Sequence, residues 1–358
     1  MKEKDLVFLK NLLDAPSPSG FEQPAADVFR RRMEAGADSV GTDVMGSVHA
    51  LLRGRRGGVS VMLAGHIDEV GLMVRYITAE GFVSFAAIGG VDAAILPGTR
   101  VRLHTASGSL LGVLGRKPDH LIEDDERKQV TRLDKLFIDL GLPVAEVRKR
   151  VRVGDPITYD SSFAPLGTGL AVCRAFDDKM GAWIAARVLE EVRAAGGAAG
   201  DLVATATVQE EVGHRGGATS AYSLDPVVGI ALDVDHATDY PDIDRRAHGD
   251  IQCGAGPVLA RGPNINPVLF ELLVQAAEKA RVPYQVSAEP GGTGTDANDI
   301  QISRGGKVAG LVSIALRYMH TPTEVLALKD LDSAVKLLTR FVLDLDPATD
   351  FTPRMRQA

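Results

Sequence analysis

The chain has 358 residues, which suits two average domains or one large domain that carries an insertion. Hydrophobic residues make up 45% and charged residues 24% of the sequence, so we expect a folded core and exclude a disordered chain. The 40 basic and 47 acidic residues give a net charge of −7 without a long basic block. This balance argues against nucleic acid and anionic membranes as partners.

Two further features bear on where the protein works. Cys173 and Cys253 are isolated from each other and form no CxxC pattern, which argues against a disulfide framework and a thiolate zinc site. No apolar run approaches the roughly 18 residues of a membrane span, and the amino-terminal segment does not read as a secretory signal. We therefore expect a cytoplasmic location.

The first seventy residues predict two helices followed by two strands. Leucines at helical spacing indicate an amphipathic first helix that ends at Pro16, and a second helix is expected at about Gln23–Glu34. A strand is expected around Ser47–Leu52. The largely apolar run VSVMLAGHIDEVGLMV, from Val59, is typical of a central parallel strand that is covered on both faces.

Residues 71–162 have a different pattern of apolar and turn-forming residues. Short β-rich runs at Val101–Leu103, Leu111–Leu114 and Pro156–Tyr159 alternate with Gly and Pro, which predicts a small inserted domain resembling a barrel or a sandwich. The stretch 116–135 mixes both charge signs. We expect it to be an exposed loop, with an assembly surface as the alternative.

From Asp177 onward, helix and strand patterns alternate, which is typical of an α/β fold with a mostly parallel sheet and helices on both faces. Helices are expected at Met180–Arg193 and Pro267–Ala280. Strands are expected at Leu202–Val208, Pro226–Leu232 and Val308–Leu316. The first seventy residues should join the same sheet. The larger domain is then discontinuous, comprising residues 1–70 and 163–358.

Polar residues follow four of the predicted strands. The carboxyl ends of parallel strands meet at one edge of an open sheet, so these side chains should point into one crevice. Imidazoles together with carboxylates are the ligands of hydrolytic zinc or cobalt sites. The residues are His66, Asp68, Glu210, Glu211, Asp233 and His320, with Asp177 at the start of a helix.

Each of these residues also has an ordinary structural explanation when it is taken alone. A histidine such as His66 at a strand end is more often structural, and Asp177 could simply cap a helix. Glu210 and Glu211 could be solvated loop acids, and His214 in the same turn could be a surface residue. The convergence of several segments, rather than any one residue, favours a metal site.

Spacing also suggests how the site would be organised. Asp68 lies two residues after His66 in an extended chain, so it can accept a hydrogen bond from the ring nitrogen that does not bind metal. The side chains of two adjacent glutamates diverge, so one can bind metal while the other reaches a water molecule. Spacing does not decide between Asp233 and its neighbours Asp235, His236 and Asp239.

Five segments resemble successive motifs of the TET, or glutamyl-aminopeptidase-like, family of dinuclear metallopeptidases: AGHIDEVGLMV, AFDDKMG, VQEEVGHRGG, ALDVDHATDYP and RYMHTPTEV. Shorter matches lie between them, namely GGVDAAILPG, GVLGRKPDHL, LFIDLG and GTDAN. The resemblance thus covers nearly the whole chain in order. It implies a phosphorylase/peptidase-like catalytic domain with an inserted β-barrel-like domain for dimerisation.

The resemblance also implies a set of metal ligands. His66 and Asp233 would hold one divalent ion, Glu211 and His320 would hold a second ion, and Asp177 would bridge the two. Zinc is the expected metal, with cobalt or manganese as other candidates, because all three accept nitrogen and oxygen ligands.

The remaining roles follow from the same resemblance. Glu210 would be the general base that takes a proton from the water bridging the two ions, and Asp68 would support His66. The peptide bond between Asp177 and Asp178 would be cis. The reaction would be release of amino-terminal residues from peptides with a free amine, and the chain would self-associate through residues 71–162 into dimers and then tetrahedral dodecamers.

The preferred amino-terminal residue of the substrate stays open at this stage. Arg245, Arg246, Asp296 and the segment around Cys253 are candidate determinants without a ranking.

Three alternatives to an aminopeptidase remain. A related dinuclear deacylase or carboxypeptidase would use the same ligands on another amide. A glycosidase such as an endoglucanase is disfavoured, because the acids occur together with His66 and His320, and the chain has a single tryptophan, Trp183. A non-catalytic assembly protein is opposed by the presence of Glu210. HExxH, GxSxG and GxxxxGK[ST] signatures are absent from the sequence.

Overall fold

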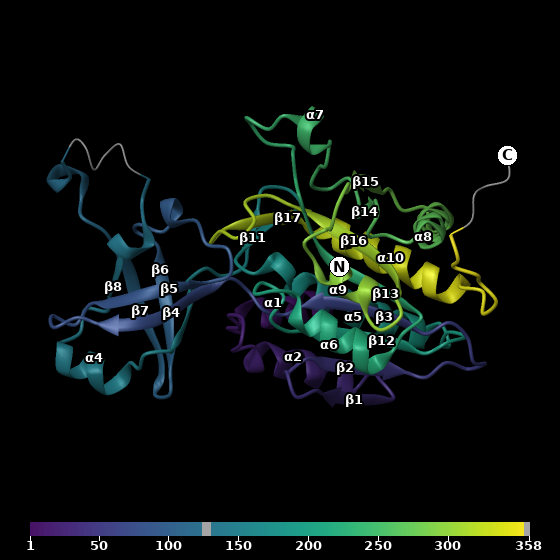
Figure 1. The fold of residues 1–358 in the computed structure, drawn as a ribbon, viewed down its shortest axis with the longest axis horizontal. Helices are drawn as coiled ribbons and strands as arrows, with labels where there is room; N and C mark the ends of the chain where they lie inside the picture. The colour runs from purple at the N-terminus through teal and green to yellow at the C-terminus, as the bar shows by residue number, and fades with distance from the viewer. Residues whose placement is uncertain (124–129, 354–358) are drawn as a thin grey trace.

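The computed structural model describes residues 1–123 and 130–353. The chain forms two lobes of unequal size, and Figure 1 shows the smaller lobe at one end of an elongated molecule. The first and the last described residues, Met1 and Pro353, both belong to the larger lobe. Part of the charged stretch 116–135, residues 124–129, lies outside the described residues.

An eight-stranded sheet forms the centre of the larger lobe. Its four central strands are parallel neighbours. On each side of these four, the next strand runs antiparallel to the central strand that it pairs with. In spatial order the strands are β1 (Ser39–Thr42), β2 (Val48–Leu52), β12 (Leu202–Thr207), β3 (Val61–His66), β13 (Val228–His236), β16 (Val308–Leu316), β14 (Val258–Arg261) and β15 (Gln285–Ala288).

The central strands are buried along their length, which explains their continuous apolar sequence. Every residue of β3 and β12 is buried, as is almost every residue of β13 and β16. A parallel strand that is covered on both faces needs apolar side chains on both sides, not an alternating pattern. The expected mostly parallel α/β sheet is therefore confirmed, and β1 and β2 show that the first seventy residues join it.

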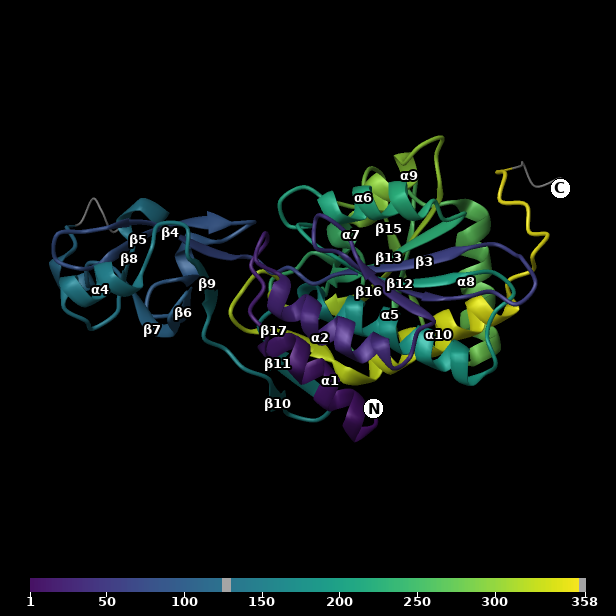
Figure 2. The same ribbon diagram turned by 90° about the horizontal axis from the view of Figure 1, so that it is seen from below.

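Helices cover both faces of this sheet (Figure 2). On one face lie α1 (Glu3–Asp14), α2 (Gln23–Glu34), α5 (Phe176–Ala194) and α10 (Leu328–Asp344), and α8 (Pro267–Ala280) packs against α10. On the other face lie α6 (Arg215–Leu224) and α9 (Asp296–Ile302), while the short α7 (Arg245–His248) lies on a long loop. Trp183 of α5 is fully buried, and its indole nitrogen donates to the carbonyl of Asp5 in α1 at 2.9 Å.

Two glycines let α5 approach the end of β3 very closely. A Cβ atom on Gly65 would lie 2.2 Å from the backbone nitrogen of Ala182 in α5, and one on Gly181 would lie 2.7 Å from the backbone carbonyl oxygen of Leu232 in the adjacent strand β13. Any larger residue at either position would push the helix away from the strand. The start of α5 is thereby held directly beside the carboxyl end of β3.

The smaller lobe is a closed six-stranded barrel with its own apolar core, which confirms the expected barrel-like insert. Around the barrel the strands are β4 (Gly71–Ile77), β5 (Val83–Ile88), β8 (Phe137–Asp139), β7 (Gly108–Gly115), β6 (Arg100–Thr105) and β9 (Pro156–Tyr159). Its core includes Leu72, Val101, Leu103, Ile138 and Ile157.

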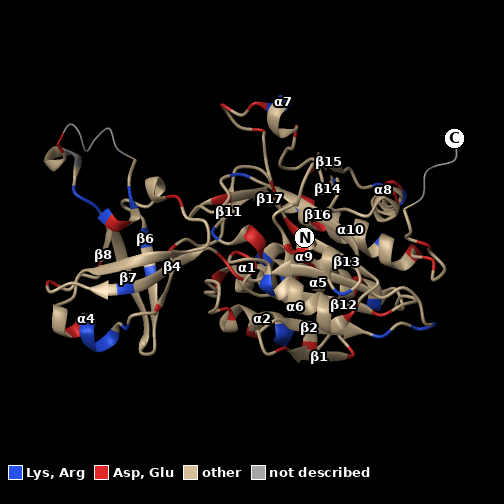
Figure 3. Ribbon diagram, viewed as in Figure 1, with Lys and Arg blue, Asp and Glu red and all other residues tan. Residues whose placement is uncertain are grey.

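The barrel lobe also contains helical segments that its short β-rich runs did not predict. These are α4 (Val144–Arg150) and the 3-10 turns η1 (Ala93–Ile95), η2 (Asp119–Leu121) and η3 (Leu133–Lys135). The last turn of α4 carries Arg148, Lys149 and Arg150. Figure 3 shows that acidic and basic residues are otherwise interspersed over both lobes.

A second small sheet was not predicted from the sequence. It contains β10 (Ala164–Leu166), β11 (Leu170–Cys173) and β17 (Glu324–Ala327), all antiparallel. The pairing of Cys173 with Glu324 brings β17 to the strand that leads into α5. In the part of the chain that the structure describes, no helix combines the length and apolar composition needed to cross a bilayer.

Candidate metal centre

The carboxyl ends of the four central strands bring the predicted ligands together. His66 is the last residue of β3, and Glu210 and Glu211 follow β12 after a short turn. His320 follows β16 in the same way. The expectation that these segments converge on one edge of the sheet agrees with the topology, because β12, β3, β13 and β16 are consecutive neighbours.

Asp233 reaches the site differently from the sequence-based expectation. The strand was expected to end at Leu232, whereas β13 continues through Asp233 alongside β16. The pairing of β13 with β3 ends at Leu232 and Gly65, so Asp233 lies level with the end of β3. Its carboxylate therefore faces the opening beyond β3, 4.0 Å from the Nε2 atom of His66.

Asp177 lies between the two histidines. Its Oδ1 atom is 3.1 Å from Nε2 of His66, and its Oδ2 atom is 3.4 Å from Nε2 of His320. The peptide bond from Asp177 to Asp178 is cis, as the resemblance implies. One carboxylate thus presents a separate oxygen to each half of the site, which is the arrangement needed to bridge two cations.

The two adjacent glutamates point to different places. Oε2 of Glu211 is 3.3 Å from Nε2 of His320, whereas Oε2 of Glu210 is 3.9 Å from Nε2 of His66. Among the described residues, no hydrogen-bond partner reaches the buried Oε1 atom of either glutamate. Buried carboxylate oxygens without a donor are costly unless a ligand or a cation supplies the missing interaction.

The crowding of carboxylates changes their protonation. Burial, reinforced by neighbouring acids, raises the pKa of Glu210 to about 10, that of Glu211 to about 8 and that of Asp233 to about 7. Burial opposes charge on His320 as well, but Asp177 and Glu211 outweigh it and raise its pKa to about 9. Without a cation these acids therefore tend to keep their protons, and a bound cation would compensate the negative charge that forms when the protons leave.

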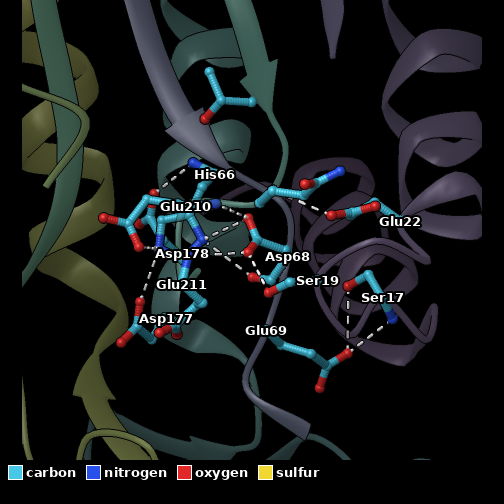
Figure 4. Close-up of polar contacts among 12 residues, drawn as sticks. Ser17, Ser19, Glu22, His66, Asp68, Glu69, Asp177, Asp178, Glu210 and Glu211 are labelled. Atoms are coloured by element: carbon cyan, nitrogen blue, oxygen red, sulfur yellow. Dashed lines mark hydrogen bonds and ion pairs between the residues drawn. The ribbon is translucent and has the colours of Figure 1, made fainter. Parts of the chain in front are cut away.

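Asp68 organises one side of the site, and Figure 4 shows its contacts with the neighbouring residues. Its Oδ1 atom accepts from the backbone nitrogen of Glu210 at 3.0 Å and lies 3.4 Å from Nδ1 of His66. Its Oδ2 atom accepts from Ser19 at 2.6 Å and from the backbone nitrogen of Glu211 at 3.1 Å. His66 also contacts the backbone carbonyl of Asp68 at 3.1 Å, so Asp68 supports the glutamate turn as well as the histidine.

Two acids around the site had no role in the sequence-based account. Asp178 accepts from the backbone nitrogen of His66 at 3.0 Å, and Glu324 accepts from the backbone nitrogens of Asp177 and His320 at 3.2 and 3.1 Å. Both lie inside the segments AFDDKMG and RYMHTPTEV, but their contacts are made by folding of distant segments. They hold the backbone that presents the candidate ligands.

His214 also occupies a position that the sequence did not reveal. Its Nε2 atom lies 3.4 Å from Oε1 of Glu210, and its Nδ1 atom lies 2.9 Å from Asp299 of α9. The residue has φ of +51° at the start of α6, a conformation that is uncommon outside glycine. His214 is therefore not merely a surface residue, because it lies against the side of Glu210 that lacks a hydrogen bond.

A cavity of about 430 Å³ opens onto these residues. Beyond the candidate ligands, its lining includes Asp235, Glu289, Thr293 and Thr295. A neighbouring cavity of about 760 Å³ contains Arg245 and Arg246.

The structure thus places the residues that were candidates for substrate specificity in different parts of the larger lobe. Arg245 and Arg246 line the neighbouring cavity rather than the one above the ligands. Asp296 is buried and accepts from Thr207 at 2.6 Å. The thiol of Cys253 contacts the carbonyl of Ala315 at 3.4 Å. The loop before α9 does line the cavity, through Thr293 and Thr295.

The donor set matches a metal centre. Ligand atoms of His66, Asp177 and Glu211 lie within 4.8 Å of one another, as do those of His66, Asp178 and Asp233. The two groups share His66, so they describe one continuous cluster. Imidazole nitrogen combined with carboxylate oxygen suits zinc, cobalt or manganese, and the residues could hold such an ion.

The chain is similar to known proteins over most of its length. A model of the M42 glutamyl aminopeptidase family matches residues 46–337. The lysyl aminopeptidase of Pyrococcus furiosus is 33% identical over 356 residues, covering 98% of this chain and 99% of the relative.

Solved structures are similar over nearly the whole chain. A TET aminopeptidase from a marine sediment archaeon of the Thaumarchaeota is 34% identical with a TM-score of 0.91, covering 96% of this chain and 98% of the other. The TET1 peptidase of Pyrococcus horikoshii is 27% identical with a TM-score of 0.84, covering 95% of this chain and 100% of the other. That peptidase can assemble into a tetrahedron or a large octahedral shell. The chain therefore belongs to the M42 glutamyl aminopeptidase family.

Proposed function

We propose that this protein is a metal-dependent aminopeptidase that removes amino-terminal residues from peptides and uses two divalent ions per chain. The observation that carries the proposal is the position of Asp177, whose two carboxylate oxygens face His66 and His320 separately. A single metal would require only one of these faces. The membership of the M42 family supports the same reaction class.

The ligand assignment follows from the contacts. His66 and Asp233 would hold one ion, Glu211 and His320 would hold the other, and Asp177 would bridge them. When bound, such ions polarise the scissile carbonyl and lower the pKa of water from ~15.7 towards ~7. Zinc is our first expectation, with cobalt and manganese as alternatives.

Glu210 is the candidate general base. It lies beside the ligand cluster without matching either ligand pair, and its Oε1 atom has no hydrogen-bond partner among the described residues. Its carboxylate would take a proton from the attacking water and pass it to the departing amine. Burial raises the pKa of Glu210 to about 10 without ions, and positive charge bound beside it would lower this pKa, so that the carboxylate could accept the proton.

Asp68 would serve the reaction through other residues. It holds the imidazole of His66 and the backbone of Glu210 and Glu211 in one arrangement. Support of this kind fixes both the ring orientation and the direction of the base. Asp68 therefore acts as a positioning residue rather than as a ligand.

The assembly of one structural relative suggests that this chain also self-associates. We propose that residues 71–162 form the dimerisation domain, and that dimers assemble further into a tetrahedral dodecamer. We keep the cytoplasm as the expected location, because Cys173 and Cys253 are both free thiols.

Two alternative activities are less well supported. A dinuclear deacylase or carboxypeptidase would use the same ligands, so only the requirement for a free amine separates it from our proposal. A glycosidase would use two carboxylates on opposite sides of a sugar and commonly offers aromatic side chains. The described lining of the cavity contains aliphatic, polar and ionisable residues but neither Phe, Tyr nor Trp.

The proposal is tested by combining metal removal with a blocked substrate. We expect the purified protein to bind two divalent ions per chain, as measured by elemental analysis, and to cleave a peptide with a free amine. Chelation should abolish cleavage, and zinc, cobalt or manganese should restore it. Full activity after complete removal of metal, or equal cleavage of the acetylated peptide, would contradict the proposal.

A further inference from the structure

The cavity above the candidate metal centre contains two carboxylates that the proposed mechanism does not use. Asp235 follows the candidate ligand Asp233 by two residues on β13, and Glu289 follows the edge strand β15. Both side chains line this one cavity, so a single bound side chain could meet both. Both line the larger neighbouring cavity as well, so they lie where the two cavities meet.

Glu289 is held in place within the site. The hydroxyl of Ser287 donates to its Oε1 atom at 2.6 Å, which fixes the direction of the carboxylate. Ser287 is neutral, so this hydrogen bond leaves the full negative charge in place. A positioned anion at the mouth of a cavity can select the charge of whatever enters.

The nearest arginines do not neutralise these acids. Arg245 donates to the carbonyl of Thr238 and pairs with Asp250 at 3.3 Å, and Arg246 pairs with Asp244 at 3.5 Å. In the described ranges, neither Lys nor Arg lines the cavity above the ligands. The negative charge of Asp235 and Glu289 is therefore available to a substrate.

The rest of the lining suits an aliphatic stem. Val234, Ala260, Leu311 and Met319 contribute apolar surface to the same cavity. A side chain with several methylene groups and a cationic tip could cover this surface while its charge meets the carboxylates. An acidic side chain would instead place a like charge beside two anions, which is unfavourable.

We propose that Asp235 and Glu289 form a subsite that selects substrates with a cationic amino-terminal side chain, namely lysine or arginine. This inference rests on the proposed aminopeptidase function and deepens it. The family description names a glutamyl aminopeptidase and one relative is named a lysyl aminopeptidase, so these names do not decide the sign; the charge of this cavity favours a cationic side chain. The two carboxylates determine specificity, and the candidate metal ligands beside them carry out the reaction.

The experiment compares fluorogenic amides of lysine, arginine, norleucine and glutamate at low salt. Norleucine has the same stem as lysine without the ammonium group, so the lysine-to-norleucine ratio of kcat/KM isolates the charge. We expect a ratio of at least ~10 for the wild-type protein and the lowest value for glutamate. The double variant Asp235→Asn/Glu289→Gln should bring the ratio close to 1, and Glu289→Lys should raise the relative rate for glutamate.

Glu278→Gln/Glu80→Gln, at two exposed glutamates outside the cavity, is the matched control, because it also removes two negative charges. It should leave the lysine-to-norleucine ratio unchanged. A wild-type preference for glutamate, or a ratio that the double variant does not lower, would overturn the proposal.

Calorimetry separates failure of this inference from failure of the proposed function. Free L-lysine should bind the wild-type protein at least ~5-fold more tightly than L-norleucine, and the double variant should lose this difference. If no amide is cleaved but lysine is still preferred, the aminopeptidase proposal fails and the cationic subsite stands. Equal binding of the two amino acids would overturn the subsite whatever the activity.

Discussion

Glu210 and Glu211 show how neighbouring residues of the same type acquire different roles. Both are carboxylates that follow β12, yet Glu211 contacts the candidate ligand His320 while Glu210 faces His66 and His214. The difference arises because Asp68 holds both backbone nitrogens and thereby fixes the direction of each side chain.

The role of Glu210 is tested by Glu210→Gln. We expect this variant to bind both ions, because Glu210 is outside the proposed ligand set, and to lose at least ~10² in kcat, because an amide cannot accept the proton. Elemental analysis and steady-state kinetics measure the two effects. A variant with normal turnover would assign the base to another residue.

His214 lies against the unpartnered oxygen of Glu210, and its own ring contacts Asp299. We expect His214→Ala to lower kcat about 10-fold with little change in KM or metal content, because the direction of Glu210 becomes less defined. His214→Gln, which keeps a donor, should recover part of the loss. His120→Ala in the barrel lobe is the control, and an equal effect there would mean that His214 has no special role.

Three elements of the larger lobe meet at Glu69, which follows Asp68. Its carboxylate accepts from Ser17 in the loop after α1 and from Lys179 of α5, both through Oε1, and forms an ion pair with Arg174. All three charged side chains are buried. This buried network ties the turn after β3 to the start of α5, so it supports the position of the candidate ligands on both elements.

The electrostatic balance of this network is mixed. Burial opposes the charge of Glu69, but the attraction of Arg174 and Lys179 outweighs it and lowers the pKa of Glu69 to about 2. Burial dominates at Lys179 and lowers its pKa to about 8. The cost of burying the charged lysine therefore offsets part of the stability that the ionised glutamate contributes. Removing only the glutamate would leave two buried cations without their partner.

We therefore expect Glu69→Gln to lower the free energy of unfolding by roughly 3–5 kcal/mol, as measured by urea denaturation. Glu34→Gln, which removes an exposed partner of Arg30, should change it by less than ~1 kcal/mol. Similar losses in the two variants would show that the buried network contributes no special stability.

The same network predicts a dependence of stability on pH. Because the pKa of Glu69 is lower in the folded state than its usual 4.5, its contribution is present above pH 4.5 and is lost as the pH falls towards 2. Lys179 and Arg174 are protonated in the folded and the unfolded state over this range, so they do not affect how the free energy of unfolding changes with pH. The loss of stability between pH 4.5 and 2 should be smaller in Glu69→Gln than in the wild-type protein.

At the scale of the whole molecule, the barrel lobe extends away from the sheet (Figure 1). It also carries exposed apolar side chains. On β7, Leu111 and Val113 both point outward, with 48% and 43% of their surface exposed. Exposed apolar residues on one strand face are suited to contact with another chain.

We expect the wild-type protein to elute as an oligomer, and Leu111→Glu/Val113→Glu to shift it to a smaller species, as measured by light scattering. Val44→Glu, at a fully exposed apolar residue of the larger lobe, should leave the size unchanged. A strictly monomeric wild-type protein at micromolar concentration would contradict the proposed self-association.

The sequence alone was sufficient for the fold class, the family and most of the central elements. The helix at Pro267–Ala280 and the strand at Val308–Leu316 agree with the expected ranges, because their apolar periodicity and their punctuation by Pro and Gly are local properties. The motifs also predicted that the candidate ligands lie close together, because residues at the carboxyl ends of parallel strands share one edge of a sheet.

Tertiary structure decided what local patterns do not contain. The sheet of β10, β11 and β17 joins segments that are about 150 residues apart in the chain, and through it Glu324 reaches the backbone of Asp177. Likewise, His214 gains its contact with Asp299, and Asp235 and Glu289 meet in one cavity, only when distant segments pack together. Sequence motifs therefore determined which residues are available for the proposed chemistry, whereas long-range packing determined which residues surround them as proposed positioning and specificity residues.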